Sequence, residues 1–507
     1  MKIKPQITVL FLLSVFTLLL IISVIFPKNG IPLLGNMRLR FPSPKDILKP
    51  GDADYADISF IIENNALLTD STFEQMDRQV EEESWDTVRA NADSLRRSIC
   101  RLQFPKNNKK LFYSAFRSFE NAASASKPVR ILHYGDSQIE GDRITSFLRN
   151  KLQNKFGGMG PGLMPVEQVY DFSFSILQEN SNNWYRYTLY GSRDTTLTHN
   201  RYGALASFCR FSPYGSDTLT DVNNPFEAWV SFAPSSYSYP NTKNFRLCRV
   251  FYSHNKEPFM AEIYQKEVLS DADIYPTSES LQTIRWVFDE PENSIRIVFR
   301  GVNSPDIYGI ALDDLSGIAV DNIPMRGNSG LVFTKMDKNL LLQHFKALNV
   351  KMIILQFGGN VAPHITTDYT YYEKLFAAQI KRIHQILPDA AVIVIGVADM
   401  SIKKRNRYVS YPNIEKIRDA LKKASLESGA AYWDLYEAMG GKNSMPSWVF
   451  ANPPLASSDF VHFNPKGAKI IANMFYNALM FEYNRYKKDP ENNPDQKETL
   501  PNANSQN

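Results

Sequence analysis

The residues whose types could carry out chemistry most clearly are Ser137, Asp459 and His462. Ser137 lies near one end of the folded part of the chain, and Asp459 and His462 lie near the other. A serine hydroxyl is a weak nucleophile unless a neighbouring base takes its proton. Asp and His three residues apart on a turn can hydrogen-bond, so Asp459 would orient the His462 imidazole and stabilise its charged form. The pattern therefore predicts nucleophilic catalysis if the fold brings the two segments together. The alternative is structural, because Gly-Asp-Ser and Asp-x-x-His also occur as helix caps.

Attack by a serine on an acyl carbon creates an oxyanion that needs hydrogen-bond donors. Asn360 and Gly327 each follow an expected strand, and the backbone N–H of Ser137 precedes an expected helix. We expect these three groups to form the oxyanion hole, with Gly330 and Gly317 as alternatives to Gly327. Gly and Asn after strands are ordinary turn residues, so the prediction depends on all the elements occurring together.

The elements expected to position these residues alternate between strand and helix. Apolar runs predict buried strands at residues 129–134, 317–323, 351–357, 391–397 and 431–435. Amphipathic spacing predicts helices at residues 142–156, 334–348, 371–387, 411–428 and 466–483. This alternation predicts a parallel sheet covered on both faces, with the ligand site beyond the carboxyl ends of the strands.

The middle of the chain has a different pattern. Short alternating runs rich in aromatic and β-branched residues predict antiparallel strands and an inserted β-sandwich. Six of its aromatic residues could stack on sugar rings, although most are expected to be core residues: Trp184, Tyr185, Tyr187, Tyr202, Trp229 and Trp286. Asp313 and Asp314 are expected in the turn that leads from the insert back to the sheet.

The four motifs together resemble those of SGNH (GDSL-type) hydrolases, whose blocks contribute Ser, Gly, Asn and His. The matching residues are Ser137 in Gly-Asp-Ser, Gly327, Asn360 in Gly-Gly-Asn, and His462 in Asp-Phe-Val-His. The resemblance implies a flavodoxin-like three-layer fold, a Ser–His–Asp triad and the oxyanion hole named above. The third block departs from the commoner Gly-x-Asn-Asp because Val361 follows the asparagine.

A closer resemblance concerns the run from Ile131 to Gln138 and the glycine-rich loop at residues 157–162. Both are similar to those of periplasmic peptidoglycan O-acetylesterases and related O-acetyltransferases, which also carry a β-rich, carbohydrate-module-like insert. The resemblance implies acetyl esters on a cell-envelope or secreted polysaccharide as substrate. It leaves open acetyl transfer to a glycan hydroxyl, with acetyl received from a membrane partner, and a glycan-binding protein without catalysis. Candidate substrate contacts are Asp136, Gln138, Gly359 and His364.

These patterns divide the chain into seven parts. They are a signal anchor (1–30), a tether (31–84), a helical lead-in (85–126), the first hydrolase part (127–165), the β-rich insert (166–312), the second hydrolase part (313–485) and a disordered tail (486–507).

The N-terminal residues predict in which cellular compartment the protein lies. An apolar run over residues 7–26 is long enough to span a bilayer as a helix, and Lys2 and Lys4 precede it. We expect an uncleaved anchor in the inner membrane and an extracytoplasmic, periplasmic bulk, with a cleaved signal peptide as the alternative.

The remaining composition excludes several classes of function. With 57 basic and 53 acidic residues, the chain shows no basic stripe that would indicate nucleic-acid binding. Its histidines share no metal-ligand spacing, so neither a metal nor a cofactor is expected. Cys209 and Cys248 could pair in an oxidising compartment, although two small buried side chains are the favoured interpretation.

Overall fold

The computed structural model describes residues 5–27, 31–32, 38–39, 55–65, 101–106, 109–214 and 225–489. It divides into two compact units, Met1–Ala56 with Lys403–Arg407, and Asp57–Ile402 with Tyr408–Asn507. Most of the predicted tether, the lead-in helix before residue 101 and the predicted tail from residue 490 lie outside the described residues.

The first unit contains helix α1 (Pro5–Ile25) and the antiparallel pair β1 (Ile31–Pro32) and β2 (Arg38–Leu39). Large apolar side chains are exposed along α1 from Val9 onward. Within the part of the chain that the structure describes, no helix is found with the length and apolarity of a membrane span. The membrane anchor stays a prediction.

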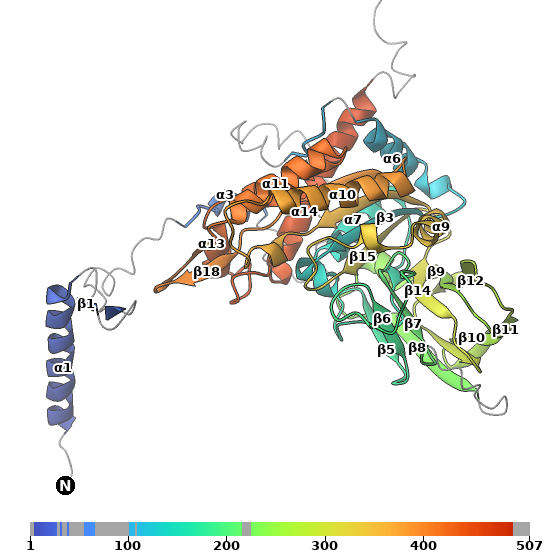
Figure 1. Cartoon of the computed structure of the whole chain (residues 1–507), viewed down its shortest axis with the longest axis horizontal. Helices are drawn as coiled ribbons and strands as arrows, with labels where there is room; N and C mark the ends of the chain where they lie inside the picture. Colours follow the sequence, from blue (N-terminus) through green and yellow to red (C-terminus); the bar gives the residue numbers. More distant parts are fainter. Residues whose placement is uncertain are drawn as a thin grey trace, which may run out of the picture. The chain divides into compact units, whose positions relative to one another are not determined.

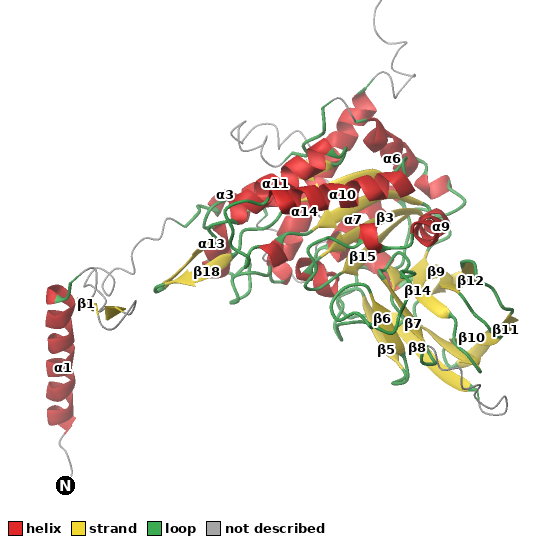
Figure 2. Cartoon of the chain, viewed as in Figure 1, coloured by secondary structure: helices red, strands yellow, loops and turns green. Residues whose placement is uncertain are grey.

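The second unit is built on a five-stranded parallel sheet, as the alternation of strands and helices predicted (Figure 2). Its order is β15 (Ile318–Pro324), β3 (Val129–Gly135), β16 (Val350–Gln356), β17 (Ala391–Ile395) and β20 (Ala431–Trp433). The strands are almost fully buried, and their side chains point alternately into the apolar layers on the two faces of the sheet. The α/β class is therefore confirmed.

Among the residues that the structure describes, three helices pack on each face of this sheet. One layer consists of α6 (Lys110–Glu120), α7 (Thr145–Phe156) and α14 (Pro465–Lys488), which contact one another. The other consists of α9 (Lys338–Leu348), α10 (Thr370–Ile386) and α11 (Ile414–Glu427). Leu132 and Tyr134 of β3 belong to the apolar core under this second layer, because alternate residues of a strand face the same side.

The structure also describes several short elements. They are α3 (Ser59–Asn64), η1 (Ala122–Ser124), η2 (Ser137–Asp142), α8 (Pro240–Lys243), η3 (Phe333–Lys335), η4 (Gly359–Val361), β18 (Ser401–Lys404), β19 (Arg407–Ser410), α12 (Leu435–Ala438) and α13 (Ser444–Phe450).

The insert forms two antiparallel sheets (Figure 1). The first has the order β12 (Gln282–Glu292), β9 (Phe245–Ser253), β14 (Asp306–Asp313), β7 (Ser207–Arg210) and β6 (Tyr185–Thr188), with β4 (Gly162–Met164) also on β14. The second has the order β11 (Val268–Tyr275), β10 (Phe259–Gln265), β13 (Ile295–Gly301), β8 (Phe226–Pro234) and β5 (Ile176–Asn180). Side chains of both sheets, such as Val250 and Phe299, share one buried core.

The insert's aromatic residues mostly fill cores. Trp184, Tyr187, Tyr202 and Trp286 are buried, which agrees with their expected structural role, whereas Tyr185 is 43% exposed. The same holds for the two described cysteines: Cys209 and Cys248 are both buried and unpaired. Burial raises the pKa of the Cys209 thiol to about 12, so this thiol stays protonated.

The prediction for Asp313 was wrong. Instead of lying in a turn, Asp313 ends β14 and is fully buried, where its carboxylate accepts from Arg130 of β3 at 2.6 Å and Arg249 of β9 at 2.9 Å. The Arg130 guanidinium also binds Asp321 of β15 at 2.5 Å. This buried charge network joins the insert to two strands of the parallel sheet.

Replacement of Arg130 tests the network. Arg130→Ala leaves Asp313 and Asp321 buried without their shared cation, and removal of one partner from a buried ion pair costs about 3–5 kcal/mol. We expect a large fall in the melting temperature, measured by calorimetry. Arg285→Ala, an exposed arginine of β12, is the matched control. Equal melting temperatures for the two variants would contradict the structural role.

Candidate active site

Three adjacent strands bring the predicted residues to one edge of the sheet. In the order β15, β3 and β16, the segments that follow the strands carry Gly327, Ser137 and Asn360. Parallel strands end at the same edge, which explains why motifs far apart in sequence meet there. A Cβ at Gly135 would lie 2.9 Å from the Ile139 side chain and 3.0 Å from the Gln356 carbonyl oxygen, so the turn into η2 needs glycine at this position.

Ser137, His462 and Asp459 form a continuous hydrogen-bonded chain. Ser137 Oγ lies 2.8 Å from His462 Nε2, and His462 Nδ1 lies 2.7 Å from Asp459 Oδ2. The other oxygen of Asp459 accepts from the backbone N–H groups of Val461 at 2.9 Å and His462 at 3.0 Å. The carboxylate thus fixes both the ring and the loop that carries it, which is the arrangement of a base ready to deprotonate Ser137.

The electrostatics favour an ionised Asp459. Burial alone would raise the pKa of its carboxyl group. The hydrogen bonds from the His462 ring and from the backbone of His462 and Val461 outweigh that effect and lower the pKa below its ordinary value. The carboxylate therefore stays charged at neutral pH and can stabilise an imidazolium on His462.

The loop between Asp459 and His462 is held in an unusual conformation that sequence analysis missed. Phe460 has a φ of 60°, a left-handed value that is uncommon for a large side chain. Its ring stacks on Tyr408 with centroids 3.5 Å apart, and its carbonyl accepts from the Ser401 N–H at 3.0 Å. No spacing in the sequence links residues 401–408 to this loop.

Among the three candidate glycines, hydrogen bonding favours Gly327 as the donor. The N–H of Gly317 donates to the Ala122 carbonyl at 2.7 Å, and the N–H of Gly330 donates to Asn328 Oδ1 at 2.7 Å. No such bond is found for the Gly327 N–H within the described chain, and its φ of 74° suits glycine.

Asn328 and Asn360 connect the two loops that are predicted to carry oxyanion donors. Asn360 Nδ2 donates to the Asn328 carbonyl at 3.0 Å. The Asn328 side chain in turn accepts from the Gly330 and Leu331 N–H groups, which shapes the loop after β15. One N–H of the Asn360 amide thus holds the loop, and a primary amide has a second N–H to offer an oxyanion.

The four candidate substrate contacts have different surroundings. Asp136 is buried and accepts from the Gln138 N–H at 3.0 Å. Gln138 is also buried, and its amide donates to the Val461 carbonyl at 2.5 Å, so it positions the His462 loop from the Ser137 side. Gly359 is partly exposed beside Asp136, and His364 is exposed. Asp136 and Gln138 thus make internal hydrogen bonds, and their contact with substrate stays a prediction.

Burial also sets the ionisation of Asp136. Removal from water raises the pKa of its carboxyl group to about 6, and hydrogen bonds from the backbone of Gln138 and Gly359 only partly oppose this shift. The pKa of Asp136 is therefore raised above its ordinary value, whereas the pKa of Asp459 is lowered below it. Asp136 precedes Ser137 in the sequence, and Asp459 is part of the hydrogen-bonded chain.

Comparison with known proteins agrees with this geometry. Residues 300–470 match the model of the GDSL-like Lipase/Acylhydrolase family. No curated protein matches the chain in sequence. A solved peptidoglycan O-acetylesterase is similar in fold, with a TM-score of 0.58 and 16% identity, covering 76% of this chain and 99% of that chain.

Two further solved structures match more weakly. A GDSL-like lipase from Parabacteroides merdae has a TM-score of 0.24 and 18% identity, covering 32% of this chain and 73% of its own. A family two carbohydrate esterase from Clostridium thermocellum has a TM-score of 0.21 and 9% identity, covering 51% of this chain and 93% of its own.

Asn360 provides a test of the oxyanion hole. Asn360→Ala is expected to lower kcat for a small ester by about 10²–10³-fold, because one donor to the oxyanion is lost. Asn360→Asp, which keeps the shape but replaces the amide by a carboxylate, is expected to lose at least as much. Steady-state kinetics on p-nitrophenyl acetate measures both, and a loss below about 3-fold in both variants would assign the donor elsewhere.

Asp136 provides a test of pH dependence. Its pKa is raised on folding, so folding takes up a proton between about pH 4 and pH 6, and this contribution to stability is lost as pH rises through that window. Asp136→Asn cannot titrate. The melting temperature of the variant relative to wild type should therefore increase from pH 4 to pH 6 and stay level above it. A difference that is constant over this range would refute the shifted pKa.

Proposed function

We propose that this chain, whose residues 300–470 match the GDSL-like Lipase/Acylhydrolase family, is a serine esterase that removes O-acetyl groups from a cell-envelope or secreted polysaccharide. The observation that carries the proposal is the hydrogen-bonded chain from Ser137 Oγ through His462 to Asp459, at 2.8 Å and 2.7 Å. If Ser137 had only a structural role, it would need neither the hydrogen bond to the His462 ring nor an Asp459 carboxylate with a lowered pKa on the far side of that ring.

The geometry gives each residue a step in ester cleavage. His462 Nε2 takes the proton of Ser137 Oγ as this oxygen attacks the acyl carbon, and Asp459 stabilises the resulting imidazolium. The N–H groups of Ser137 and Gly327 and the amide of Asn360 would donate to the oxyanion. His462 then protonates the departing sugar oxygen, which leaves an acyl group on Ser137. Water, deprotonated by His462, attacks this acyl group, and acetate leaves as Ser137 regains its proton.

The glycan as substrate is supported by the two-domain organisation. The similarity to the peptidoglycan O-acetylesterase extends over 99% of that protein and 76% of this chain, so it includes more than the α/β sheet. Shared fold alone does not determine the substrate. The sequence motifs around Ser137 point in the same direction, because they resemble those of the same class of esterase.

We also propose that the enzyme works outside the cytoplasm, anchored in the inner membrane by its N-terminal segment. The support is the apolar run at residues 7–26 with Lys2 and Lys4 before it. This location would place the active site in the compartment that holds envelope polysaccharides.

Transfer is the second candidate. It uses the same acyl group on Ser137, with a sugar hydroxyl instead of water as acceptor. The partly exposed Ser137 and His462 leave access for either acceptor, so the two reactions are separated by product analysis.

Acetate release tests both reactions. The full-length chain is incubated with O-acetylated peptidoglycan, with and without a sugar acceptor, and free acetate and acetylated acceptor are measured. We expect Ser137-dependent acetate release that a sugar acceptor does not reduce. Ser137→Ala is expected to abolish it, whereas Ser114→Ala, an exposed serine of α6, should retain it. Acetyl on the acceptor at the expense of acetate would establish transfer, and equal activity of Ser137→Ala and wild type would refute the nucleophile.

A further inference from the structure

Three aromatic rings of the insert form a cluster outside its buried core. Phe172, Phe174 and Tyr237 contact one another edge to face, with centroids 4.9 Å, 6.0 Å and 5.7 Å apart. Phe172 is 49% exposed and Tyr237 is 46% exposed. Most large aromatic residues of the insert are buried, so solvent-exposed rings that hold each other in place are unusual here. We call these three residues the aromatic ridge.

The aromatic ridge packs on the short helix that begins with Ser137. The Phe174 N–H donates to the Gly141 carbonyl at 2.8 Å, and Gly141 lies in η2 (Ser137–Asp142). A Cβ at Gly141 would lie 3.3 Å from the Phe172 carbonyl oxygen and 3.4 Å from its ring. The insert and the element that carries the nucleophile are therefore in direct contact.

A pocket lies on the histidine side of the aromatic ridge. Phe174 and Tyr237 line it from the insert, Arg143 from the segment after η2, and Pro465 and Lys469 from α14. Arg143 also donates to the carbonyl of Phe463, the residue after His462, at 3.3 Å. This pocket thus adjoins the catalytic loop and contains two cationic side chains.

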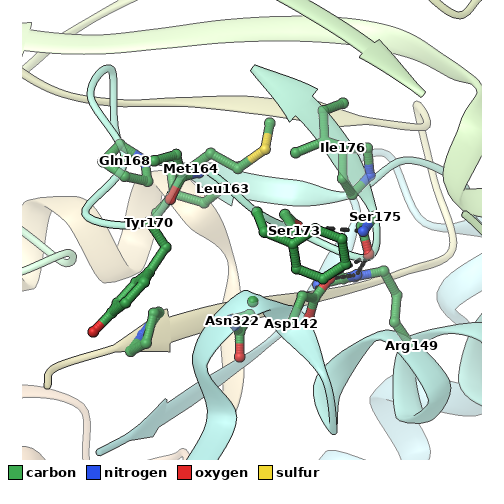
Figure 3. Close-up of a pocket in the computed structure, with 15 residues that line it drawn as sticks. Asp142, Arg149, Leu163, Met164, Gln168, Tyr170, Ser173, Ser175, Ile176 and Asn322 are labelled. Carbon is green, nitrogen blue, oxygen red and sulfur yellow. Dashed lines mark hydrogen bonds and ion pairs between the residues drawn. The ribbon is translucent and has the colours of Figure 1, made fainter. Parts of the chain in front are cut away.

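A second pocket lies on the other side (Figure 3). Phe172 and Tyr170 line it from the insert, and Asn322 and Pro324 from β15, the strand before Gly327. Arg326, which precedes Gly327, lies over the Tyr170 ring at 4.7 Å and pairs with Glu140 of η2 at 3.4 Å. This pocket is therefore next to the oxyanion side of the site.

Rings flanked by polar pockets suit a carbohydrate. The C–H face of a sugar ring packs on an aromatic face, while its hydroxyls need donors and acceptors beside it. The aromatic ridge supplies the first, and Arg143, Lys469 and Asn322 supply polar groups in the two pockets.

Resting on the esterase function proposed above, we propose that the aromatic ridge is a glycan-binding subsite that holds a sugar unit next to the acetylated one. The enzyme accordingly takes an oligomeric or polymeric glycan and not an acetylated monosaccharide. The subsite is held in register with Ser137, because the Tyr134 hydroxyl of β3 donates to the Ala204 carbonyl of the insert at 2.8 Å and the two domains share buried apolar residues.

The test compares a small ester with a glycan. Phe172→Ala and Tyr237→Ala, singly and combined, are assayed in the full-length chain on p-nitrophenyl acetate and on O-acetylated peptidoglycan. We expect kcat/KM for peptidoglycan to fall about 3- to 10-fold in each single variant, mainly through KM, with kcat/KM for p-nitrophenyl acetate unchanged. Tyr185→Ala, an exposed aromatic residue of β6 that lines neither pocket, should change neither value.

The remaining outcomes separate the two proposals. Equal losses on both substrates would overturn the subsite, because the rings would then only support the fold around Ser137. Unchanged kinetics on both substrates would also overturn it and would favour docking of another protein on the aromatic ridge. If wild type cleaves p-nitrophenyl acetate in a Ser137-dependent way but releases no acetate from any glycan, the proposed substrate fails, and the subsite fails with it.

Discussion

The site depends on one buried cation, the Arg130 guanidinium. It lies on β3, the strand that leads to Ser137, and binds Asp321 of β15, the strand that leads to Gly327, at 2.5 Å. It also binds Asp313, the last residue of the insert's β14, at 2.6 Å. A buried guanidinium tolerates little movement of its partners, because each displaced carboxylate would remain in the interior without a counter-charge. One side chain on the strand before Ser137 therefore binds both the strand before Gly327 and the insert.

Asp459 and Asp136 both lie near Ser137, but their different surroundings give the two carboxyl groups different pKa values. Asp459 collects several hydrogen bonds, which lower its pKa despite partial burial. Asp136 is fully enclosed, and burial raises its pKa to about 6. The first is therefore suited to stabilise a positive charge on His462, whereas the second serves as a backbone acceptor that shapes the turn around Ser137.

The sequence predicted what local spacing and periodicity determine. Ser137, Asp459 and His462 could be found because their motifs are short and because strand ends converge in a parallel sheet. The sequence named Gly327 first but left Gly330 and Gly317 open, because the backbone hydrogen bonds that separate them leave no composition pattern. Asp313 was wrongly assigned to a turn, since its buried role appears only when distant arginines are in place.

The aromatic ridge was missed for a related reason. The sequence does not distinguish an aromatic residue in a core from one that faces solvent. Trp184 and Trp286 were therefore considered as sugar-binding residues although they are buried, whereas the exposed Phe172 was not considered. What distinguishes Phe172 is its contact with Gly141, four residues after Ser137, and this contact depends on how the two domains pack together. An insert that merely bound glycan could be tethered loosely. A buried charge network and a shared apolar core are what an insert needs in order to present a substrate to a nucleophile at fixed distance.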